Sequence, residues 1–175
     1  GYNMALRNIV TVGDPVLTKV CRPVTKFDDR LAQLLDDMIQ TLHEANGAGL
    51  AAPQIGILRR VVVINTEGED WELINPEIVE VSEEQQTGIE GCLSLPGRWG
   101  IVTRPEYAKV RAQDRHGDWY EYEGEDLTAR CFLHEIDHLD GHMYTEFAEK
   151  MLTPEELEEL LKEQEDAAED EDAEV

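Results

Sequence analysis

The sequence predicts a single compact α+β domain in which short, mostly antiparallel strands surround a central helix, with a further helix near the C-terminus. Two observations predict this class. The chain has 175 residues, a length that suits one hydrophobic core. Its local patterns follow the order helix, strands, helices, and no internal repeat or linker divides them.

The first helix follows an irregular lead-in that covers residues 4–27 and contains Asp14-Pro15 and Pro23. Asp28 or Asp29 is suited to cap this helix, and Asn46-Gly47 ends it. Its apolar positions recur at helical spacing. They are Leu31, Leu34, Leu35, Met38, Ile39 and Leu42.

The middle of the chain predicts strands, because short segments rich in valine, isoleucine and aromatic residues alternate with turn residues. Asn75-Pro76 is interpreted as a turn between two strands, and residues 114–118 as a hairpin turn. The predicted strands cover residues 60–65, 72–75, 78–82, 102–103, 107–113 and 119–122.

A second helix is predicted over residues 126–139, because Asp140-Gly141 stops the pattern. Leu127, Cys131 and His138 fall on its inward or partly inward faces. A third helix begins at Thr153, with Pro154 in its first turn and Glu156 completing a capping box.

We expect the third helix to end after Gln164. Residues 165–175 then form an acidic, disordered tail outside a folded domain of residues 1–164. From position 155 onwards the chain carries twelve acidic residues against one lysine. This composition indicates a solubilising end; the alternative is a contact with a basic partner such as a ribosomal protein.

The net charge of −24 argues against direct nucleic-acid binding and against an anionic membrane surface, since both need a basic patch. No apolar stretch is long enough to span a bilayer. Three cysteines, an odd number, fit a reducing cytoplasm better than a disulfide framework. The sequence therefore predicts a cytoplasmic protein.

The segment His134-Glu135-Ile136-Asp137-His138 is the most specific sign of chemistry. Residues four apart lie on one face of a helix, so the two imidazoles are placed to bind one divalent metal ion. Glu135 lies about 100° further round the helix, where a general base for an activated water belongs. The alternative interpretation is two ordinary surface histidines on an acidic helix.

A catalytic site of this kind needs a third protein ligand and one open position. Cys131 and His142 lie on the same helical region as the two histidines, and either would stretch the ligand set over three turns. A ligand from another segment closes a tetrahedron more easily. Cys92, flanked by Gly91 in a segment that reads as a bent strand or loop, is the leading candidate. The alternative for either cysteine is a small buried core residue, which we favour for Cys131.

Residues 47–56 form a third notable segment, Gly-Ala-Gly-Leu-Ala-Ala-Pro-Gln-Ile-Gly. Its small residues allow a ligand or another strand to approach the backbone closely. Gln54 is an uncharged donor that could polarise a carbonyl group. A tight helix-to-strand connection would explain the same composition.

Together the three segments resemble the signature motifs of the peptide deformylase family, in the same order. The family motifs are Gly-x-Gly-Leu-Ala-Ala-x-Gln, Glu-Gly-Cys-Leu-Ser and Gln-His-Glu-x-x-His, and the matching segments here are Gly47–Gln54, Glu90–Ser94 and His134–His138. Leu133 stands where the family has glutamine, so a hydrogen bond that tunes the metal is expected to be missing. The resemblance implies hydrolysis of the N-formyl group on the first methionine of nascent polypeptides.

The resemblance also implies a set of site residues. Cys92, His134 and His138 hold one divalent metal, which is Fe(II) in the cell and which Zn or Ni can replace. Glu135 is the general base, while Gln54 and the Leu93 backbone N–H stabilise the oxyanion. The substrate-binding residues implied are Gly49, Gly91, Leu127 and Cys131. The partner implied is the N-formylmethionyl peptide. A transient contact with the ribosome is expected only on the alternative interpretation of the acidic tail. Whether Arg130 lines the methionine pocket stays open.

Three other functions compete with this interpretation. A metallo-endopeptidase fits the helix motif alone, although a thiolate ligand such as Cys92 is unusual there. A closed structural metal site would need a fourth protein ligand and would leave Glu135 without a role. An inactive family member would not need every matched position to be intact, as they are here.

Overall fold

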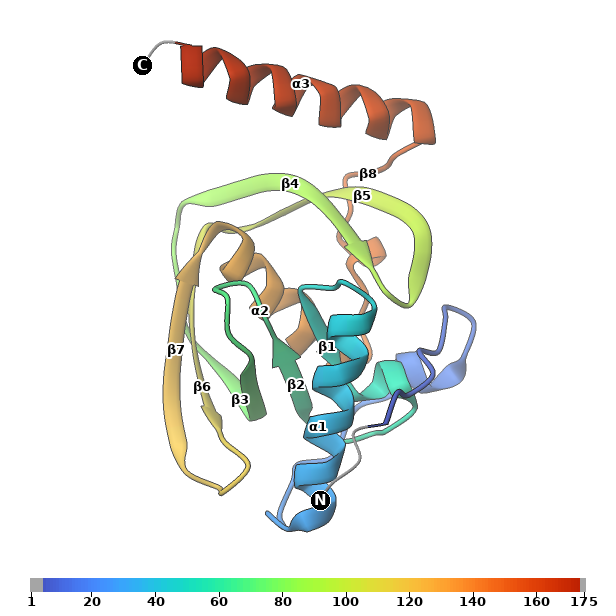
Figure 1. The fold of residues 1–175 in the computed structure, drawn as a ribbon, viewed down its shortest axis with the longest axis vertical. Helices are drawn as coiled ribbons and strands as arrows, with labels where there is room; N and C mark the ends of the chain where they lie inside the picture. The colour runs from blue at the N-terminus through green and yellow to red at the C-terminus, as the bar shows by residue number, and fades with distance from the viewer. Residues whose placement is uncertain (1–4, 174–175) are drawn as a thin grey trace.

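The structure is a computed structural model that describes the backbone of residues 5–173 and the side chains of residues 5–168. Two antiparallel sheets and three α-helices make up the fold (Figure 1). The larger sheet has the order β1 (Gly49–Ala51), β2 (Val61–Ile64), β3 (Trp71–Val81), β6 (Tyr107–Gln113) and β7 (Trp119–Glu125). The smaller sheet has the order β4 (Gln85–Cys92), β5 (Leu95–Pro105) and β8 (Lys150–Met151). The predicted α+β class is confirmed.

The larger sheet lies between two helices, α1 (Asp29–Glu44) and α2 (Asp126–Leu139). Strand β2 shows how the sequence achieves this arrangement, because all four of its residues are fully buried. Val62 and Ile64 pack on the α2 side, whereas Val61 and Val63 pack on the α1 side. A strand covered on both faces needs apolar residues at every position, and this one has them.

Helix α2 is central, because it contacts strands of both sheets as well as the 3-10 turn Ala52–Ile55. It extends over the residues predicted, 126–139, and Gly141 takes a positive φ of 79° just after it. A side chain at Gly141 would lie 2.5 Å from the backbone oxygen of Thr18, so the chain reversal there requires glycine. The helix that carries the histidine motif is thereby fixed at its C-terminal end.

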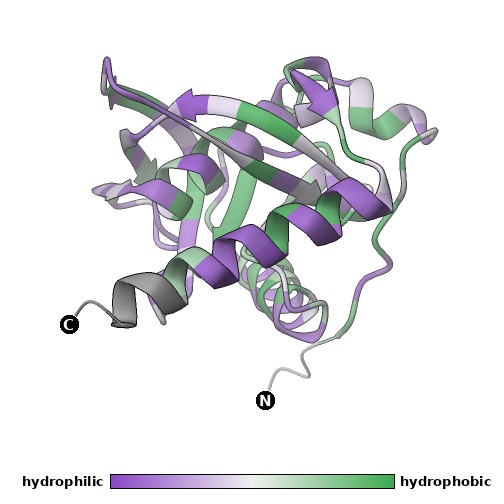
Figure 2. Ribbon diagram, turned by 90° about the horizontal axis from the view of Figure 1, so that it is seen from above, coloured by the Kyte–Doolittle hydropathy of each residue, from purple (hydrophilic) through white to green (hydrophobic). Residues whose placement is uncertain are grey.

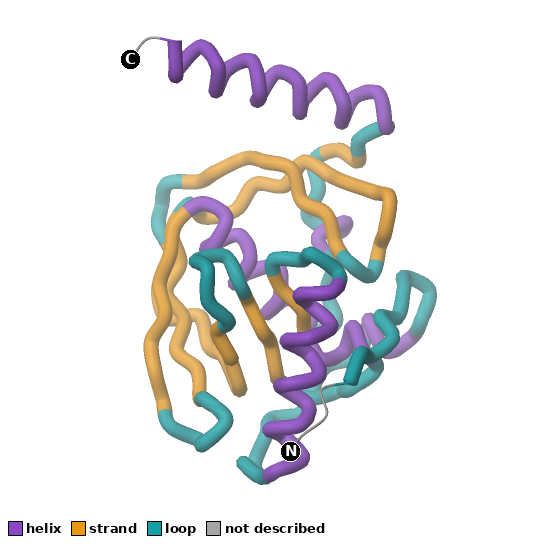
Figure 3. Tube along the Cα trace, in the orientation of Figure 1, coloured by secondary structure: helices purple, strands orange, loops and turns teal. Residues whose placement is uncertain are grey.

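The caps of the other two helices also follow the sequence. Asp28 caps α1, accepting the N–H of Leu31 at 3.0 Å. For α3 (Pro154–Ala173), Thr153 and Glu156 exchange hydrogen bonds of 3.1 and 3.2 Å, which is the predicted capping box. From residue 5 to α1 the chain is loop, apart from the 3-10 turn Pro15–Thr18 and an isolated β-bridge at Arg22 (Figure 3).

Two strand predictions need correction. Asn75-Pro76 is not a turn between strands; it lies inside β3, where the pairing with β6 shifts register. Asn75 adopts a positive φ of 52°, and its side chain bonds both the N–H and the C=O of Val24, so the irregularity is held by the lead-in segment. The long β4–β5 hairpin was predicted only at residues 102–103, because its glycines and polar residues obscure the alternation.

The end of α3 also differs from the prediction, since the helix continues past Gln164 to Ala173. Glutamate, alanine and glutamine favour helix and no glycine or proline interrupts them, so nothing local stops the helix. Its surface is largely hydrophilic, and it lies beyond β4 and β5, outside the two-sheet body (Figures 1 and 2). The disorder expected for residues 165–175 in solution stays a prediction. Within residues 5–173, no helix combines the length and apolar character needed to cross a membrane.

Candidate metal centre

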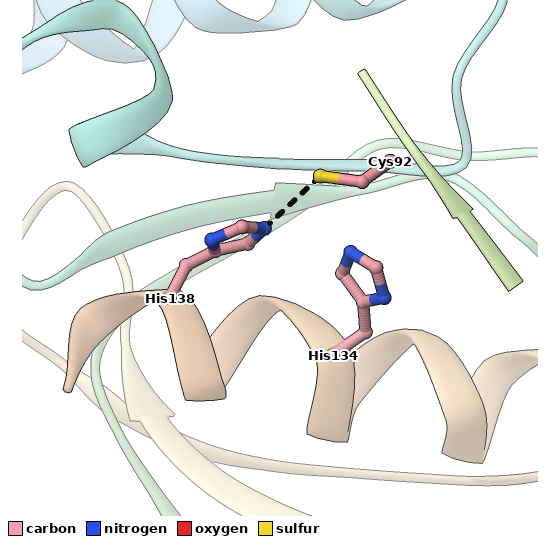
Figure 4. A group of neighbouring side chains, drawn as sticks. All are labelled: Cys92, His134 and His138. Atoms are coloured by element: carbon pink, nitrogen blue, oxygen red, sulfur yellow. Dashed lines mark hydrogen bonds between the residues drawn. The ribbon is translucent and has the colours of Figure 1, made fainter. Parts of the chain in front are cut away.

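Three potential ligands from two segments meet at the junction of the sheets (Figure 4). His134 and His138 project from successive turns of α2, and Cys92 comes from the last residue of β4. Their donor atoms all lie within 4.8 Å of one another, with Cys92 Sγ 3.3 Å from His138 Nε2. Among the described residues, this is the one group of three such side chains that converges in this way.

This donor set fits a single transition-metal ion. One thiolate and two imidazoles suit zinc or iron, with ligand bonds of about 2.0–2.3 Å. Burial holds the pKa of His138 down at about 3, so this imidazole is neutral and free to ligate. Burial also lowers the pKa of His134, but the charge of Glu135 and the contacts with Cys92 and Glu90 raise it to about 10. The surroundings of His134 therefore favour a positive charge at this point.

Glu90 is the partner that orients His134, and sequence reasoning missed it. Its carboxylate is 4% exposed and lies 2.8 Å from His134 Nδ1. Arg104 donates two further hydrogen bonds of 2.9 and 3.0 Å to Glu90, and Arg130 donates one of 2.6 Å. Burial raises the pKa of Glu90, but the hydrogen bonds and charges of His134 and Arg104 lower it to about 2, so it is a carboxylate. A bonded Nδ1 leaves Nε2 free for the metal, and this contact does not involve Leu133.

Glu135 is buried beside the two histidines and carries an unsatisfied acceptor. It is 4% exposed, and its Oε1 has no hydrogen-bond partner within the described residues. Burial raises the pKa of this carboxyl to about 7, although the charge of His134 acts against the rise. A buried oxygen without a partner beside a metal-binding group is a place for a water molecule or a substrate group.

Gln54 lies in the 3-10 turn after β1, with its amide fixed in direction. Its Oε1 accepts the N–H of Ala51 at 2.9 Å. Its Nε2 donates to Ser94 Oγ at 3.2 Å and approaches Cys92 Sγ at 3.5 Å. The donor end of the amide is therefore directed at Cys92 and Ser94, on the side of the metal centre.

A cavity of about 470 Å³ opens beside these residues. It is bordered by nine of the ten site residues predicted from the sequence, and His138 is the one that does not line it. The nine are Gly49, Gln54, Gly91, Cys92, Leu93, Leu127, Cys131, His134 and Glu135. Arg130, whose direction the sequence left open, also lines the cavity and is 6% exposed.

The side walls of the cavity differ from the expectation in one place. Leu127 is 56% exposed, because the first turn of α2 projects past the sheet, and it forms the rim instead of an inner wall. Cys131 is 6% exposed, and burial raises the pKa of its thiol well above the ordinary value. It remains a protonated thiol and lies outside the group of converging ligands.

The cavity also lies between two strands that are unpaired on one side. Strand β1 is the edge of the larger sheet and β4 is the edge of the smaller one, and both border the cavity. Gly49 on β1 leaves no room for a side chain, because a Cβ would lie 2.7 Å from Cys131 Sγ and 2.8 Å from Glu135. At Gly91 on β4, a Cβ would lie 2.7 Å from the indole nitrogen of Trp99. Glycine at these two positions therefore lets side chains of the protein itself, Glu135 and Trp99 among them, lie directly against the edge backbone.

Comparison with known proteins identifies this arrangement. Residues 6–153 match the family model for polypeptide deformylases. The chain belongs to the peptide deformylase family. The deformylase of Agathobacter rectalis is 56% identical over 149 residues, covering 85% of this chain and 94% of the relative. That of Lachnoclostridium phytofermentans is 54% identical over 146 residues, covering 82% of this chain and 89% of the relative.

Solved deformylase structures have the same fold. The enzyme from Thermotoga maritima superimposes with a TM-score of 0.81 at 40% identity, covering 83% of this chain and 99% of that one. The enzyme from Ehrlichia chaffeensis in complex with actinonin gives 0.80 at 37% identity, covering 84% and 91%. Peptide deformylases are hydrolases that remove the N-formyl group from nascent polypeptides with a single metal ion.

Proposed function

We propose that this chain hydrolyses the formyl group of N-formylmethionyl polypeptides through the residues gathered at the metal centre, releasing formate. The observation that carries the proposal is the convergence of Cys92, His134 and His138 beside the buried, unpartnered Glu135 at the wall of the cavity. A structural metal site would have no use for such a carboxylate or for an open cavity. The geometry therefore favours catalysis.

Cys92, His134 and His138 are the residues that would hold the metal. A bound divalent ion supplies a Lewis acid that lowers the pKa of water and polarises the formyl oxygen. We propose Fe(II) as the ion in the cell, with Zn or Ni able to occupy the purified protein. The mixed thiolate and imidazole set suits all three ions.

Glu135 moves the proton. Its buried carboxylate accepts a proton from the attacking water as the water oxygen bonds to the formyl carbon. When the C–N bond breaks, Glu135 returns that proton to the leaving amine, so the products are formate and a free N-terminus. A pKa near 7 suits both halves of this exchange at neutral pH.

Gln54 and Leu93 stabilise the negative charge that develops on the formyl oxygen. The Gln54 amide is already held by Ala51 and Ser94, so little reorganisation is needed when the oxyanion forms. The Leu93 backbone N–H follows Cys92 directly and lies in a residue that lines the same cavity. Loss of one such donor typically costs about 10²–10³-fold in turnover.

The peptide itself would bind as an added strand between β1 and β4. Both strands are sheet edges that border the cavity, so their backbone groups near Gly49 and Gly91 are available to pair with a peptide. Leu127 and Cys131 provide apolar surface for the methionine side chain. Residues 1–164 would form the catalytic domain, and the cell compartment we propose is the cytoplasm.

Substrate discrimination tests the proposal against a broader metallopeptidase. The reacting carbon of a formyl group carries only hydrogen, so a deformylase needs no room beyond it. We expect metal-loaded protein to hydrolyse formyl-Met-Ala-Ser efficiently and its acetyl counterpart much more slowly, since a methyl group must then fit against the metal. Replacing methionine by aspartate should also slow turnover, because a charge would enter an apolar pocket.

The assay is release of formate or of the free amine, with an unformylated peptide as a third substrate. Similar rates on formyl and acetyl peptides, or cleavage of the unformylated peptide, would overturn the assignment in favour of a metallopeptidase. A transient contact between the acidic C-terminal end and a basic ribosomal protein is a further part of the proposal. Its support is the excess of acidic residues after position 155.

A further inference from the structure

A second hollow of about 410 Å³ lies at the N-terminal end of α1. It is lined by Arg22, Pro23, Thr25, Lys26, Asp28, Arg30 and Arg59. The other end of α1 leads into Asn46 and Gly47, which border the cavity at the metal centre. The helix has 16 residues, or roughly 24 Å at 1.5 Å per residue, so the two hollows are well separated.

The charge of this hollow is opposite to that of the whole chain. The protein has 39 acidic and 15 basic residues, yet four of those cations gather here: Arg22, Lys26, Arg30 and Arg59. Within the described residues, none of these four side chains has a hydrogen bond, ion pair or ring contact, although other arginines pair with nearby carboxylates. The one acid in the lining, Asp28, is engaged in capping α1. Asp28 keeps its negative charge while it caps the helix, so four cations and one carboxylate leave the lining with a net charge of +3.

The backbone also places two of these arginines next to each other. Arg22 and Arg59 form an isolated parallel bridge, with Arg22 N–H bonded to Leu58 C=O at 3.0 Å and Arg60 N–H bonded to Arg22 C=O at 3.0 Å. Residues paired in this way project side by side, about 4.8 Å apart. Like charges directly opposite one another destabilise a ladder, so this pairing has a cost that a bound anion would relieve.

We propose that these four residues, which we name the α1 anion site, bind a compact phosphate-bearing ligand. Arginine forks match phosphate oxygens, and three arginines offer more donors than a single carboxylate can accept. A long polyanion such as RNA fits less well, because the net charge of −24 repels phosphates that extend beyond the four cations.

The test is a titration of metal-loaded, full-length protein with inorganic phosphate and with pyrophosphate at low ionic strength, followed by calorimetry and by NMR of arginine Nε–H groups. We expect saturable binding at one site, with shifts at Arg22 and Arg59. The double variant Arg22→Gln/Arg59→Gln should weaken binding at least tenfold. The control double variant Lys109→Gln/Lys162→Gln removes the same charge elsewhere and should bind normally.

Other outcomes would overturn the α1 anion site. If the titrations do not saturate, or if both double variants lose the same phosphate affinity, the binding would be nonspecific attraction to positive charge. Preferential binding of a single-stranded RNA 12-mer, with no saturable phosphate binding, would assign the surface to nucleic acid. Turnover of a short formylated peptide should be unchanged in both double variants, and the binding result is independent of whether the deformylase assignment holds.

Discussion

At the scale of single residues, the state of Glu135 governs the expected chemistry. Its carboxyl is buried, lacks a partner at Oε1, and has a raised pKa of about 7. Replacing it by glutamine keeps the shape but removes the exchangeable proton. We predict that Glu135→Gln retains one metal per chain and loses about 10²–10⁴-fold in kcat.

Glu135 also determines in which direction kcat/KM changes with pH. Burial raises its pKa, so the protonated, inactive form predominates at pH values below about 7. A divalent ion nearby favours the carboxylate and moves this transition to lower pH. The wild-type kcat/KM should therefore fall on the acid side, about tenfold per pH unit once the carboxyl is mostly protonated. An acid limb that persists unchanged in Glu135→Gln, with metal retained, would assign the titration to another group.

The two cysteines near the site give a second test at the residue scale. Cys92 converges with the histidines, whereas Cys131 is a buried thiol in the core. We predict that Cys92→Ala sharply lowers metal content measured by elemental analysis. Cys131→Ala, the matched control, should keep about one metal per chain while losing some thermal stability. The reverse pattern would identify Cys131 as the thiolate ligand.

The convergence of Cys92 with the two histidines could be predicted from the sequence, but the contacts that support His134 could not. Two histidines four residues apart lie on one face of a helix, and a cysteine beside a glycine indicates a bent segment that can direct its thiol toward them. The clamp on Glu90 depends on Arg104, fourteen residues away on β5, and on Arg130, forty residues away on α2. The first contact forms only when the β4–β5 hairpin has folded, and the second only when that hairpin packs against α2. No local sequence pattern therefore predicts either contact.

At the scale of elements, the described start of the chain is fastened to α1 by Asp37 and by Thr41, whose Oγ1 accepts the Arg7 N–H at 3.0 Å. Asp37 Oδ1 accepts the Ala5 N–H at 2.9 Å, and Asp37 Oδ2 accepts Arg7 Nε at 2.9 Å. Asp37 is 2% exposed. Burial raises the pKa of Asp37, but these hydrogen bonds outweigh it and lower the pKa overall. The segment thus covers the outer face of α1 through charge-assisted contacts.

We predict that Asp37→Asn lowers the free energy of unfolding by roughly 1–2 kcal/mol near neutral pH, allowing for the partial exposure of Arg7. Because the folded pKa is lowered, this stabilisation is present above the unfolded value of about 4. It is lost as the pH falls through the folded pKa. Thermal melts across pH should therefore show a gap between wild type and variant that narrows in acid. The exposed Asp118→Asn serves as control, and a gap independent of pH would contradict the role.

Helices and strands with a strong hydrophobic periodicity were predictable from the sequence. Strands that depend on a neighbouring strand for their pairing were not. The apolar residues of α1 recur at helical spacing, and all four residues of β2 are apolar, so the sequence alone indicates which faces of these elements are buried. Strand β1, three residues long, and β8, two residues long, form only because β2 and β5 offer free edges. The irregularity at Asn75 was read as a turn, since its cause lies in a contact with Val24, fifty-one residues away.

At the scale of the whole molecule, the acidic C-terminal end contributes little to the packed body. The side chains of residues 158, 159 and 161–168 are exposed, and neither hydrophobic core cluster includes a residue of α3. We predict that truncation after Gln164 leaves turnover of a short formylated peptide unchanged. The change in stability should stay within about 0.5 kcal/mol, as for other surface changes. A large drop in melting temperature would show that residues 165–175 pack against the domain.

The cavity between β1 and β4 has a consequence for timing. In the proposed binding mode, a peptide enters that gap only as an extended segment with its own backbone groups unpaired, because it pairs with the edge strands β1 and β4. A polypeptide whose first residues already belong to a helix, a sheet or a hydrophobic core has no extended, unpaired N-terminal segment that could bind there. The enzyme would then compete with the folding of its own substrate, and the interval in which each new chain can be processed closes when its first few residues become structured.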